Sequence, residues 1–324
     1  MSRTRAGAAA ATVAVAVAAA VAGCGGGVLA GAGPPAAKGS VAPAQTPLQA
    51  ANGPVAAAPG AHPLTLRASP VAQQVVLRFK QPPRSGLVFD LDTGEVLWQR
   101  LPTRVLPIAS LTKMMTALLV VDATRPATKA RITRAAVRAT GSKVGLLPRG
   151  RDVRVETLLN GLMLPSGNDA AIALAQHVGG TTARFVAAMN ARARAMALPC
   201  TRFASPSGII DRGNHSCAAD LAQLARAVLD KPRLARIVRR RMAVEPLPIK
   251  GGRVWMYNHN PLLRMGYPGT IGIKTGYTEA AGRCLVAAVR RAGRRIGVVL
   301  LHSPDPGTQA SKLLDRAFRR ARLR

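Results

Sequence analysis

The stretch PIASLTKMMTALLVV, residues 107–121, decides the fold of this chain. Residues 111–121 are apolar on every side, a pattern that predicts a buried helix with Ser110 at its N-terminal edge. Ser110 and Lys113 are three residues apart, which on a helix places them on one face in adjacent turns. A desolvated lysine in that position can take the proton of the serine hydroxyl. If the pair stood alone, an N-cap serine followed by a solvent-directed lysine would be the better interpretation.

Two further motifs follow along the chain. Ser166-Gly167-Asn168 comes after Leu164-Pro165 at a break between helical segments, where it offers a second hydroxyl and an amide. Lys274-Thr275-Gly276 lies in a strand-like run, in which Gly276 allows a ligand to approach the backbone. Each alone fits a plain turn or an edge-strand charge. Only the ordered set of three motifs is specific.

The remaining pattern predicts strands at both ends of the folded part and helices between them. The runs 86–91 and 95–98 flank an Asp/Gly turn and predict a hairpin. Helices are predicted at 155–164, 170–178, 182–196 and 218–229, later strands at 270–275, 283–290 and 296–302, and a basic helix at 312–322. This distribution favours an α+β domain in which distant segments pair in one antiparallel sheet.

With its three motifs, the chain resembles the serine D-alanyl-D-alanine carboxypeptidases, the low-molecular-mass penicillin-binding proteins of peptidase family S11. The matching segments are PIASLTKM at 107–114, PSGNDAA at 165–171 and GIKTGYT at 272–278, and the resemblance runs from about residue 71 to about residue 318. It implies a β-lactamase/transpeptidase-like fold, an antiparallel sheet flanked by helices with an all-helical insertion. It also implies an enzyme that needs no cofactor and no metal.

The resemblance assigns a role to each motif residue. Ser110 is expected to attack the carbonyl between two terminal D-alanines of a peptidoglycan stem peptide, and Lys113 to accept its proton. The resemblance also makes Ser166 a proton relay, gives Asn168 contacts with Lys113 and the substrate, and has β-lactams acylate Ser110. The expected substrate-binding residues are Lys274, Thr275, Gly276 and Tyr277, with an oxyanion hole from the backbone N–H groups of Ser110 and Tyr277. Where relatives often carry a basic residue near the substrate carboxylate, this chain has Ser303-Pro304-Asp305-Pro306.

The N-terminus predicts export to the cell envelope, at the outer face of the membrane or in the periplasm. Arg3 and Arg5 precede an uncharged stretch at 6–22 that ends in VAGC, residues 21–24, which resembles a lipoprotein signal with Cys24 as the lipidated residue. An ordinary signal cut near residues 30–32 is the alternative. We expect a signal peptide at 1–24, a disordered Ala/Pro/Gly-rich tether at 25–70 and the peptidase domain at 71–324. The membrane is thus an expected partner, through the signal or the lipid.

The other cysteines fit an oxidising compartment. Cys200 and Cys217 flank a short polar segment and are a candidate disulfide, whereas Cys284 lies in an apolar run and is expected to be a buried, inert thiol. Neither a zinc-finger nor a thioredoxin-like Cys-x-x-Cys pair is present.

Composition and charge exclude several other classes. A net charge of +32 attracts polyanions, but scattered basic residues and only 3% aromatic residues argue against specific nucleic-acid binding and favour wall polymers or lipid headgroups. The five histidines form no His-Glu-x-x-His motif, and Gly-x-Ser-x-Gly is absent, so a metallopeptidase and a triad hydrolase are disfavoured. A β-lactamase, a D,D-endopeptidase and an inactive wall-binding lipoprotein remain as alternatives.

Overall fold

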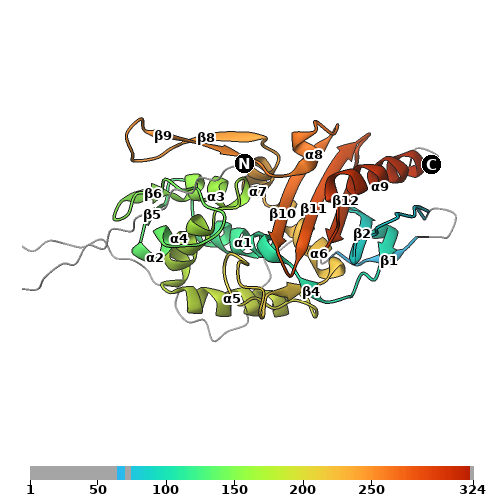
Figure 1. Cartoon of the computed structure of the whole chain (residues 1–324), viewed down its shortest axis with the longest axis horizontal. Coiled ribbons are helices and arrows are strands. Elements are labelled where there is room, and N and C mark those ends of the chain that lie inside the picture. Colours follow the sequence, from blue (N-terminus) through green and yellow to red (C-terminus); the bar gives the residue numbers. More distant parts are fainter. Residues whose placement is uncertain (1–63, 70–73, 322–324) are drawn as a thin grey trace, which may run out of the picture. The chain divides into compact units, whose positions relative to one another are not determined.

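The computed structural model describes residues 64–69 and 74–321 (Figure 1). The predicted signal at 1–24, with Cys24, and the predicted tether up to residue 63 lie outside the described residues. Within the described part, no helix combines the length and the apolar character needed to cross a bilayer. Residues 64–69 belong to the segment predicted as tether, yet Arg67–Ala68 form a short strand, so ordered chain begins before residue 71.

One six-stranded sheet organises the described chain, in the order β1-β3-β2-β12-β11-β10. Its strands are β1 (Arg67–Ala68), β2 (Ser85–Asp90), β3 (Glu95–Arg100), β10 (Thr270–Thr278), β11 (Gly282–Arg291) and β12 (Arg294–Leu301). β12 pairs with β2 in antiparallel register, with Val298 opposite Val88. The first and last parts of the folded chain therefore share one sheet, as predicted. The exception to the antiparallel pattern is β1, which runs parallel to β3.

The predicted hairpin forms because its turn supplies its own hydrogen-bond acceptor. One carboxylate oxygen of Asp90 accepts the backbone N–H groups of Asp92 and Thr93, both at 2.9 Å. Gly94 has a φ of 77°, and a Cβ there would lie 2.1 Å from the carbonyl oxygen of Thr65. Only glycine fits this position, because the segment before β1 packs directly on the turn.

Helices cover both faces of the sheet. The helical elements are the 3₁₀ turn η2 (Ala109–Thr112) and the helices α1 (Lys113–Ala123), α2 (Arg134–Val137), α3 (Val155–Met163), α4 (Asn168–Gly179), α5 (Thr182–Ala195), α6 (Ala218–Asp230), α7 (Pro232–Val238), α8 (Pro261–Arg264) and α9 (Pro306–Ala321). Along β12, Val298 belongs to the apolar cluster that includes Leu313 of α9, whereas Val299 belongs to the cluster that includes Leu221 of α6. Side chains alternate between faces along a strand, so α9 and α6 cover opposite faces.

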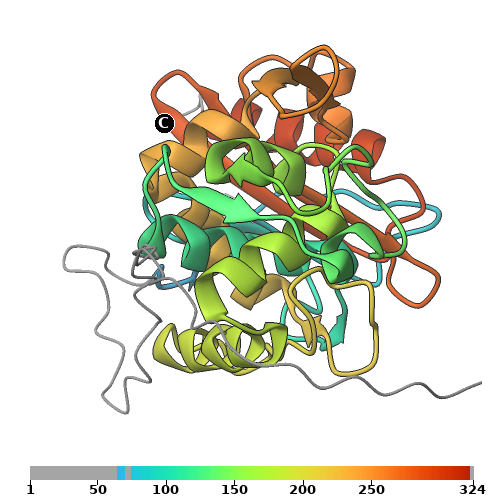
Figure 2. The same ribbon diagram turned by 90° about the vertical axis from the view of Figure 1, so that its left-hand side faces the viewer.

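The helical part of the chain lies beside this sheet. Its core is the apolar cluster that includes Val299 and Leu221. Viewed from the helical side, the green helices α3 and α4 and the olive α5 stand in front of the orange and red strands (Figure 2). α1, α3, α4 and α6 all contribute buried apolar residues to one core with the inner face of the sheet. The predicted fold class, an antiparallel sheet flanked by helices, is confirmed.

The structure differs from the sequence prediction around Ser110. The predicted helix at 111–121 begins as an α-helix only at Lys113, and Ser110 lies in the preceding 3₁₀ turn. The N–H of Leu111 donates to the carbonyl of Ile108 at 3.1 Å, which is the i→i+3 spacing of that tighter turn. Ser110 and Lys113 remain one turn apart, so their predicted contact survives the change of helix type.

Three two-stranded pairs were not predicted. They are β4 (Leu106–Pro107) with β7 (His215–Ser216), β5 (Lys129–Arg131) with β6 (Asp152–Arg154), and β8 (Met242–Pro246) with β9 (Arg253–Tyr257). The first two pairs are two or three residues long, too short to produce a detectable alternation. The β8–β9 hairpin follows α7 and precedes α8, as Figure 1 shows.

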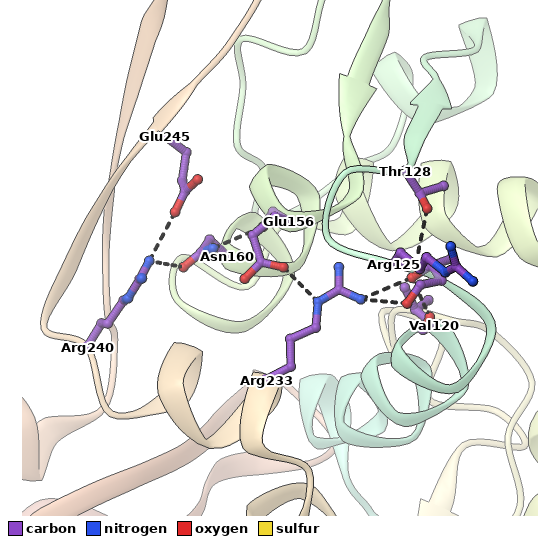
Figure 3. A network of polar contacts seen from close by, with 9 residues as sticks. Val120, Arg125, Thr128, Glu156, Asn160, Arg233, Arg240 and Glu245 are labelled. Carbon is purple, nitrogen blue, oxygen red and sulfur yellow. Dashed lines mark hydrogen bonds and ion pairs between the residues drawn. The ribbon is translucent and has the colours of Figure 1, made fainter.

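A polar network fixes α7 and the base of this hairpin to the helical part (Figure 3). The buried Arg233 of α7 donates to Glu156 of α3 at 2.7 Å and to the carbonyl of Thr124 at 2.9 Å. Arg240 donates to Glu245 at 3.0 Å and to Asn160 at 3.2 Å. Because partly buried charge pairs hold their geometry better than exposed ones, this network sets the position of residues 240–245 against α3.

Candidate active site

Lys113 lies at the centre of the site and is fully buried. Its Nζ makes three hydrogen bonds: 2.8 Å to Oγ of Ser110, 2.7 Å to Oδ1 of Asn168 and 2.7 Å to the carbonyl oxygen of Ser207. The three partners come from η2, the start of α4 and the loop before β7. The structure thus brings together two of the three predicted motifs at a single nitrogen.

The surroundings of Lys113 favour its neutral form. Burial lowers the pKa of Lys113 well below its usual value, and the positive charge of Lys274 lowers it further, while Asp169 acts in the opposite direction. A lysine that gives up its proton more readily than usual can act as a general base near neutral pH. The 2.8 Å contact with Ser110 is within the reach that proton transfer requires.

Ser166 lies in the break between α3 and α4, where the sequence predicts it. Its φ of 66° is in the left-handed region, which is costly for a residue with a Cβ. Its Oγ is buried and has no hydrogen-bond partner among the described residues. Buried hydroxyl groups are normally paired, so this oxygen is suited to a partner that arrives with a substrate. No hydrogen bond joins it to Ser110 or Lys113 in the described part of the chain.

Asn168 is held in place from two directions. Its Nδ2 donates to the carbonyl of Thr140 at 2.6 Å, and its backbone N–H donates to the carbonyl of Ser142 at 2.7 Å. The neighbouring Asp169 is buried, and its carboxylate accepts the backbone N–H groups of Val144 at 2.9 Å and Gly145 at 3.0 Å. The loop at 140–145 is therefore fixed to the start of α4, and the Oδ1 of Asn168 stays directed at Lys113.

The third motif forms the edge of the sheet beside η2. The β10 residue Lys274 is buried, and its Nζ donates to the carbonyl of Thr275 at 3.0 Å. Burial lowers the pKa of Lys274 to about 7. A Cβ on Gly276 would lie 3.0 Å from the backbone nitrogen of Ser110 and 2.9 Å from the carbonyl oxygen of Ile108, so β10 packs directly on the turn that carries Ser110. Thr275 is half-buried and Tyr277 is 62% exposed.

Comparison with known proteins agrees with this geometry. Residues 77–304 match the family described as Peptidase_S11, D-alanyl-D-alanine carboxypeptidase. The chain belongs to the S11 peptidase family. Its relatives include the D-alanyl-D-alanine carboxypeptidase DacB2 of Mycobacterium tuberculosis, 36% identical over 245 residues that cover 73% of this chain and 82% of the relative. DacF of Bacillus subtilis is 33% identical over 245 residues, which cover 72% of this chain but only 62% of the relative.

Solved structures extend the similarity to three dimensions. A D-alanyl-D-alanine carboxypeptidase of M. tuberculosis has a TM-score of 0.70 at 34% identity and covers 76% of this chain and 94% of its own. The DD-transpeptidase of Streptomyces K15 has a TM-score of 0.69 at 30% identity and covers 75% of this chain and 99% of its own. The fold of this S11 chain is therefore shared along nearly the whole length of both structures.

The loop that supplies the Ser207 carbonyl is the part of the S11 site that the sequence did not reveal. Gly208 has a φ of 76°, and a Cβ there would lie 2.0 Å from the carbonyl oxygen of Ala109. Only glycine allows this loop to pack on the residue before Ser110. A glycine next to a serine is a weak sequence signal, and a carbonyl acceptor has none, because every residue carries one.

The predicted disulfide between Cys200 and Cys217 is present in the structure and closes this same loop. Asp220 accepts the N–H of Cys200 at 2.8 Å and the hydroxyl of Thr201 at 2.7 Å. These three side chains, Cys200, Cys217 and Asp220, are close enough together to suggest a metal site, but the two sulfurs are bonded to each other. Cys284 is a buried free thiol, and burial raises its pKa to about 12, which agrees with the predicted inert cysteine.

Proposed function

We propose that this chain is a serine-type D-alanyl-D-alanine carboxypeptidase that acts on peptidoglycan stem peptides through an acyl-enzyme on Ser110. The observation that carries the proposal is the position of the Lys113 amine, which is fully buried and contacts the Ser110 hydroxyl and the Asn168 amide. Membership of the S11 family supports the same activity and substrate class.

In the acylation step, Oγ of Ser110 attacks the carbonyl carbon between the two terminal D-alanines. Its proton passes to the amine of Lys113, whose lowered pKa favours the neutral form that can accept a proton. The C–N bond then breaks, the departing D-alanine takes a proton on its amine, and the shortened peptide remains as an ester on Ser110. The unpartnered hydroxyl of Ser166 is suited to relay that proton, and Asn168 holds Lys113 and the substrate amide.

The residues at the β10 edge bind the substrate. Lys274 and Thr275 face the terminal carboxylate, for which a buried cation and a hydroxyl are suitable partners. The backbone N–H groups of Ser110 and Tyr277 form the oxyanion hole, and the absence of a side chain on Gly276 lets the strand approach Ser110 closely enough for this. Water releases the acyl group afterwards. A β-lactam follows the acylation step with its ring amide in place of the peptide bond.

A D,D-endopeptidase is the second candidate. Two relatives carry the name D-alanyl-D-alanine endopeptidase, one from Pseudomonas aeruginosa at 34% identity over 205 residues and one from Escherichia coli at 32% over 212 residues. Both enzymes would share the acylation chemistry and differ in the size of the leaving group that they accept.

Export and a lipid anchor on Cys24 are part of the proposal. The disulfide Cys200–Cys217 supports a compartment outside the cytosol, where such bonds persist. Metabolic labelling with a radioactive fatty acid should modify the wild type and leave Cys24→Ala unlabelled. Label on both proteins, or on neither, would contradict the lipid anchor and favour an ordinary secretory signal.

Fluorescent penicillin tests the enzyme proposal. The wild type should form a stable adduct and release D-alanine from diacetyl-L-lysyl-D-alanyl-D-alanine, and Ser110→Ala should do neither. Ser311→Ala, which removes a hydroxyl on α9, is the matched control and should behave as the wild type. A folded wild-type protein that does not label would refute the proposal, and rapid turnover of a chromogenic cephalosporin would identify a β-lactamase instead.

A further inference from the structure

A cavity of about 500 Å³ opens at the base of the β8–β9 hairpin. Its lining residues come from the segment before β8, the end of β9, and α8 with the residues before it: Arg241, Tyr257, Asn258, His259, Leu263 and Arg264. None of the three sequence motifs contributes to it. The roles given above to Ser110, Lys113, Ser166 and Asn168 leave this cavity without a function.

Two arginines, Arg241 and Arg264, line the cavity. Arg241 and Arg264 take part in none of the ion pairs that the structure shows among residues 64–69 and 74–321. The adjacent Arg240 is different, because it is committed to Glu245 and Asn160 (Figure 3). The network thus fixes the chain at residue 240 while the next guanidinium lines the cavity. Two such arginines favour an anion with carboxylate or phosphate geometry.

His259 connects this cavity to the candidate active site. Its backbone N–H donates to the carbonyl of Leu164 at 3.2 Å, two residues before Ser166. In the cavity wall, Nδ2 of Asn258 donates to the carbonyl of Val238 at 3.2 Å, and a Cβ on Gly272 of β10 would lie 3.3 Å from that same carbonyl oxygen. The cavity therefore borders β10 at Gly272, two residues before Lys274. Burial lowers the pKa of His259, and the positive charges of Lys274 and Arg264 lower it further, which agrees with this position.

The position along β10 decides which side of the substrate would reach the cavity. Under the proposed function, Tyr277 faces the carbonyl that is attacked, and Lys274 and Thr275 face the carboxylate of the leaving D-alanine. A cavity next to Lys274 continues the binding site on the leaving-group side. The acyl part of the peptide extends from the scissile carbonyl in the other direction.

We propose that this cavity is a subsite for acidic leaving groups, in which Arg241 and Arg264 bind a carboxylate additional to the one that Lys274 holds. The ligand class is a peptide whose leaving amino acid carries a second free carboxylate, as an acidic diamino acid does when it is the last residue of the departing stem peptide. This inference rests on the proposed function and deepens it, because it gives the chain a way to accept leaving groups larger than D-alanine.

The test compares two peptides that differ in one charge. Diacetyl-L-lysyl-D-alanyl-D-glutamate and its D-glutamine counterpart have the same shape, so the ratio of their kcat/KM values measures recognition of the second carboxylate. We expect the wild type to prefer D-glutamate by about 10-fold, within the range of a charge-assisted hydrogen bond in a partly solvated site. Raising the salt concentration should reduce this ratio, because the cavity is open to solvent.

Substitutions of the two cavity arginines test whether these residues cause the preference for D-glutamate. Arg241→Gln and Arg264→Gln should each lower the ratio by about 3-fold or more, and the double variant should bring it near 1. Arg253→Gln, at the start of β9 in the same hairpin, makes the same charge change outside the cavity and should keep the wild-type ratio. Labelling by fluorescent penicillin checks that each variant is folded.

Two results would overturn the proposal. The first is a wild-type ratio near 1 in a protein that labels with penicillin, in which case the proposed function stands and the subsite does not. The second is a preference for D-glutamate that survives in the double variant. A wild type that neither labels nor cleaves either peptide refutes the proposed function itself, and the subsite falls with it.

Discussion

Lys113 and Lys274 are buried to nearly the same degree, yet their surroundings differ. Lys113 has three hydrogen-bond acceptors from three separate segments, whereas the described residues give Lys274 one, the carbonyl of the next residue. Burial is the largest cause of the lowered pKa in both. A neutral amine keeps two N–H donors and a lone pair, so Lys113 can donate to Asn168 and Ser207 and accept the Ser110 proton, whereas Lys274 has donors left for a ligand. Burial alone therefore does not define a lysine's role, because its acceptors distinguish a base from an anion-binding group.

Removing Lys113 should have the largest effect. Lys113→Met keeps much of the side-chain volume but takes away the base that contacts Ser110. We expect acylation by penicillin and release of D-alanine to fall by about 10²- to 10⁴-fold, the usual contribution of a general base. Stopped-flow measurement of acylation checks this. Acylation at a near wild-type rate would show that Lys113 is not the base that accepts the Ser110 proton.

Removing Lys274 should cost less and depend on the substrate. Lys274→Met should lower kcat/KM on D-alanyl-D-alanine by about 10- to 100-fold, as expected for the loss of a charge-assisted hydrogen bond. Amidation of the terminal carboxylate should lower the wild-type kcat/KM by a similar factor and leave Lys274→Met nearly unaffected. If amidation lowers kcat/KM equally in the wild type and in Lys274→Met, Lys274 does not bind the terminal carboxylate.

The pH profile should separate the two groups without mutation. Protonated Lys274 attracts the carboxylate, and its pKa of about 7 means that this charge is lost as the pH rises through that value. The kcat/KM of the wild type should therefore fall above about pH 7, because that ratio reports ionisation in the free enzyme. The Lys274→Met profile should lack this fall, and its persistence there would assign the fall to another group.

Asn168→Asp should change the pKa of Lys113, and it also removes the Nδ2 donor to the carbonyl of Thr140. A carboxylate in place of the Oδ1 acceptor favours the charged amine, so the pKa of Lys113 should rise. At neutral pH less of the base is then free, and acylation should be slower by about 10-fold for each unit of that rise. Activity should recover as the pH increases. A loss that is independent of pH would instead indicate a purely structural role for Asn168.

The smallest effect on activity should follow loss of the disulfide Cys200–Cys217. The two cysteines are separated by 17 residues, and a loop of that size predicts a loss of about 3 kcal/mol in the free energy of unfolding. Thermal or urea unfolding of the Cys200→Ala/Cys217→Ala protein measures it. Acylation should slow slightly, because the loop carries the Ser207 carbonyl at Lys113, while the dependence on the substrate carboxylate at Lys274 should stay unchanged.

The part of this molecule that side chains specify could be predicted from sequence. β-rich runs predicted every strand of the six-stranded sheet except β1, and spacing predicted the contact between Ser110 and Lys113. The third acceptor of Lys113 is a backbone carbonyl, which leaves no trace in the residue type at 207. The role of Asp169 in holding the loop at 140–145 likewise depends on backbone N–H groups from a distant segment. Tertiary packing, which no local pattern encodes, brings these groups together.

The cavity beside Lys274 escaped prediction for a similar reason. Arg241 and Arg264 are separated by more than twenty residues and are two among many basic residues, so neither stands out in the sequence. They line the same cavity because the β8–β9 hairpin folds back between them. Because basic residues are common along the chain, such a site can be recognised only when the position of the hairpin is known.

The parallel pairing of β1 with β3 determines where the earlier part of the chain joins the domain. β1 and β10 are the two edges of the sheet, five strand spacings apart, which corresponds to roughly 24 Å. The segment before β1 therefore enters the sheet at the edge opposite the one that carries Thr275 and Tyr277, so a change at that entry point leaves the edge of the candidate active site untouched.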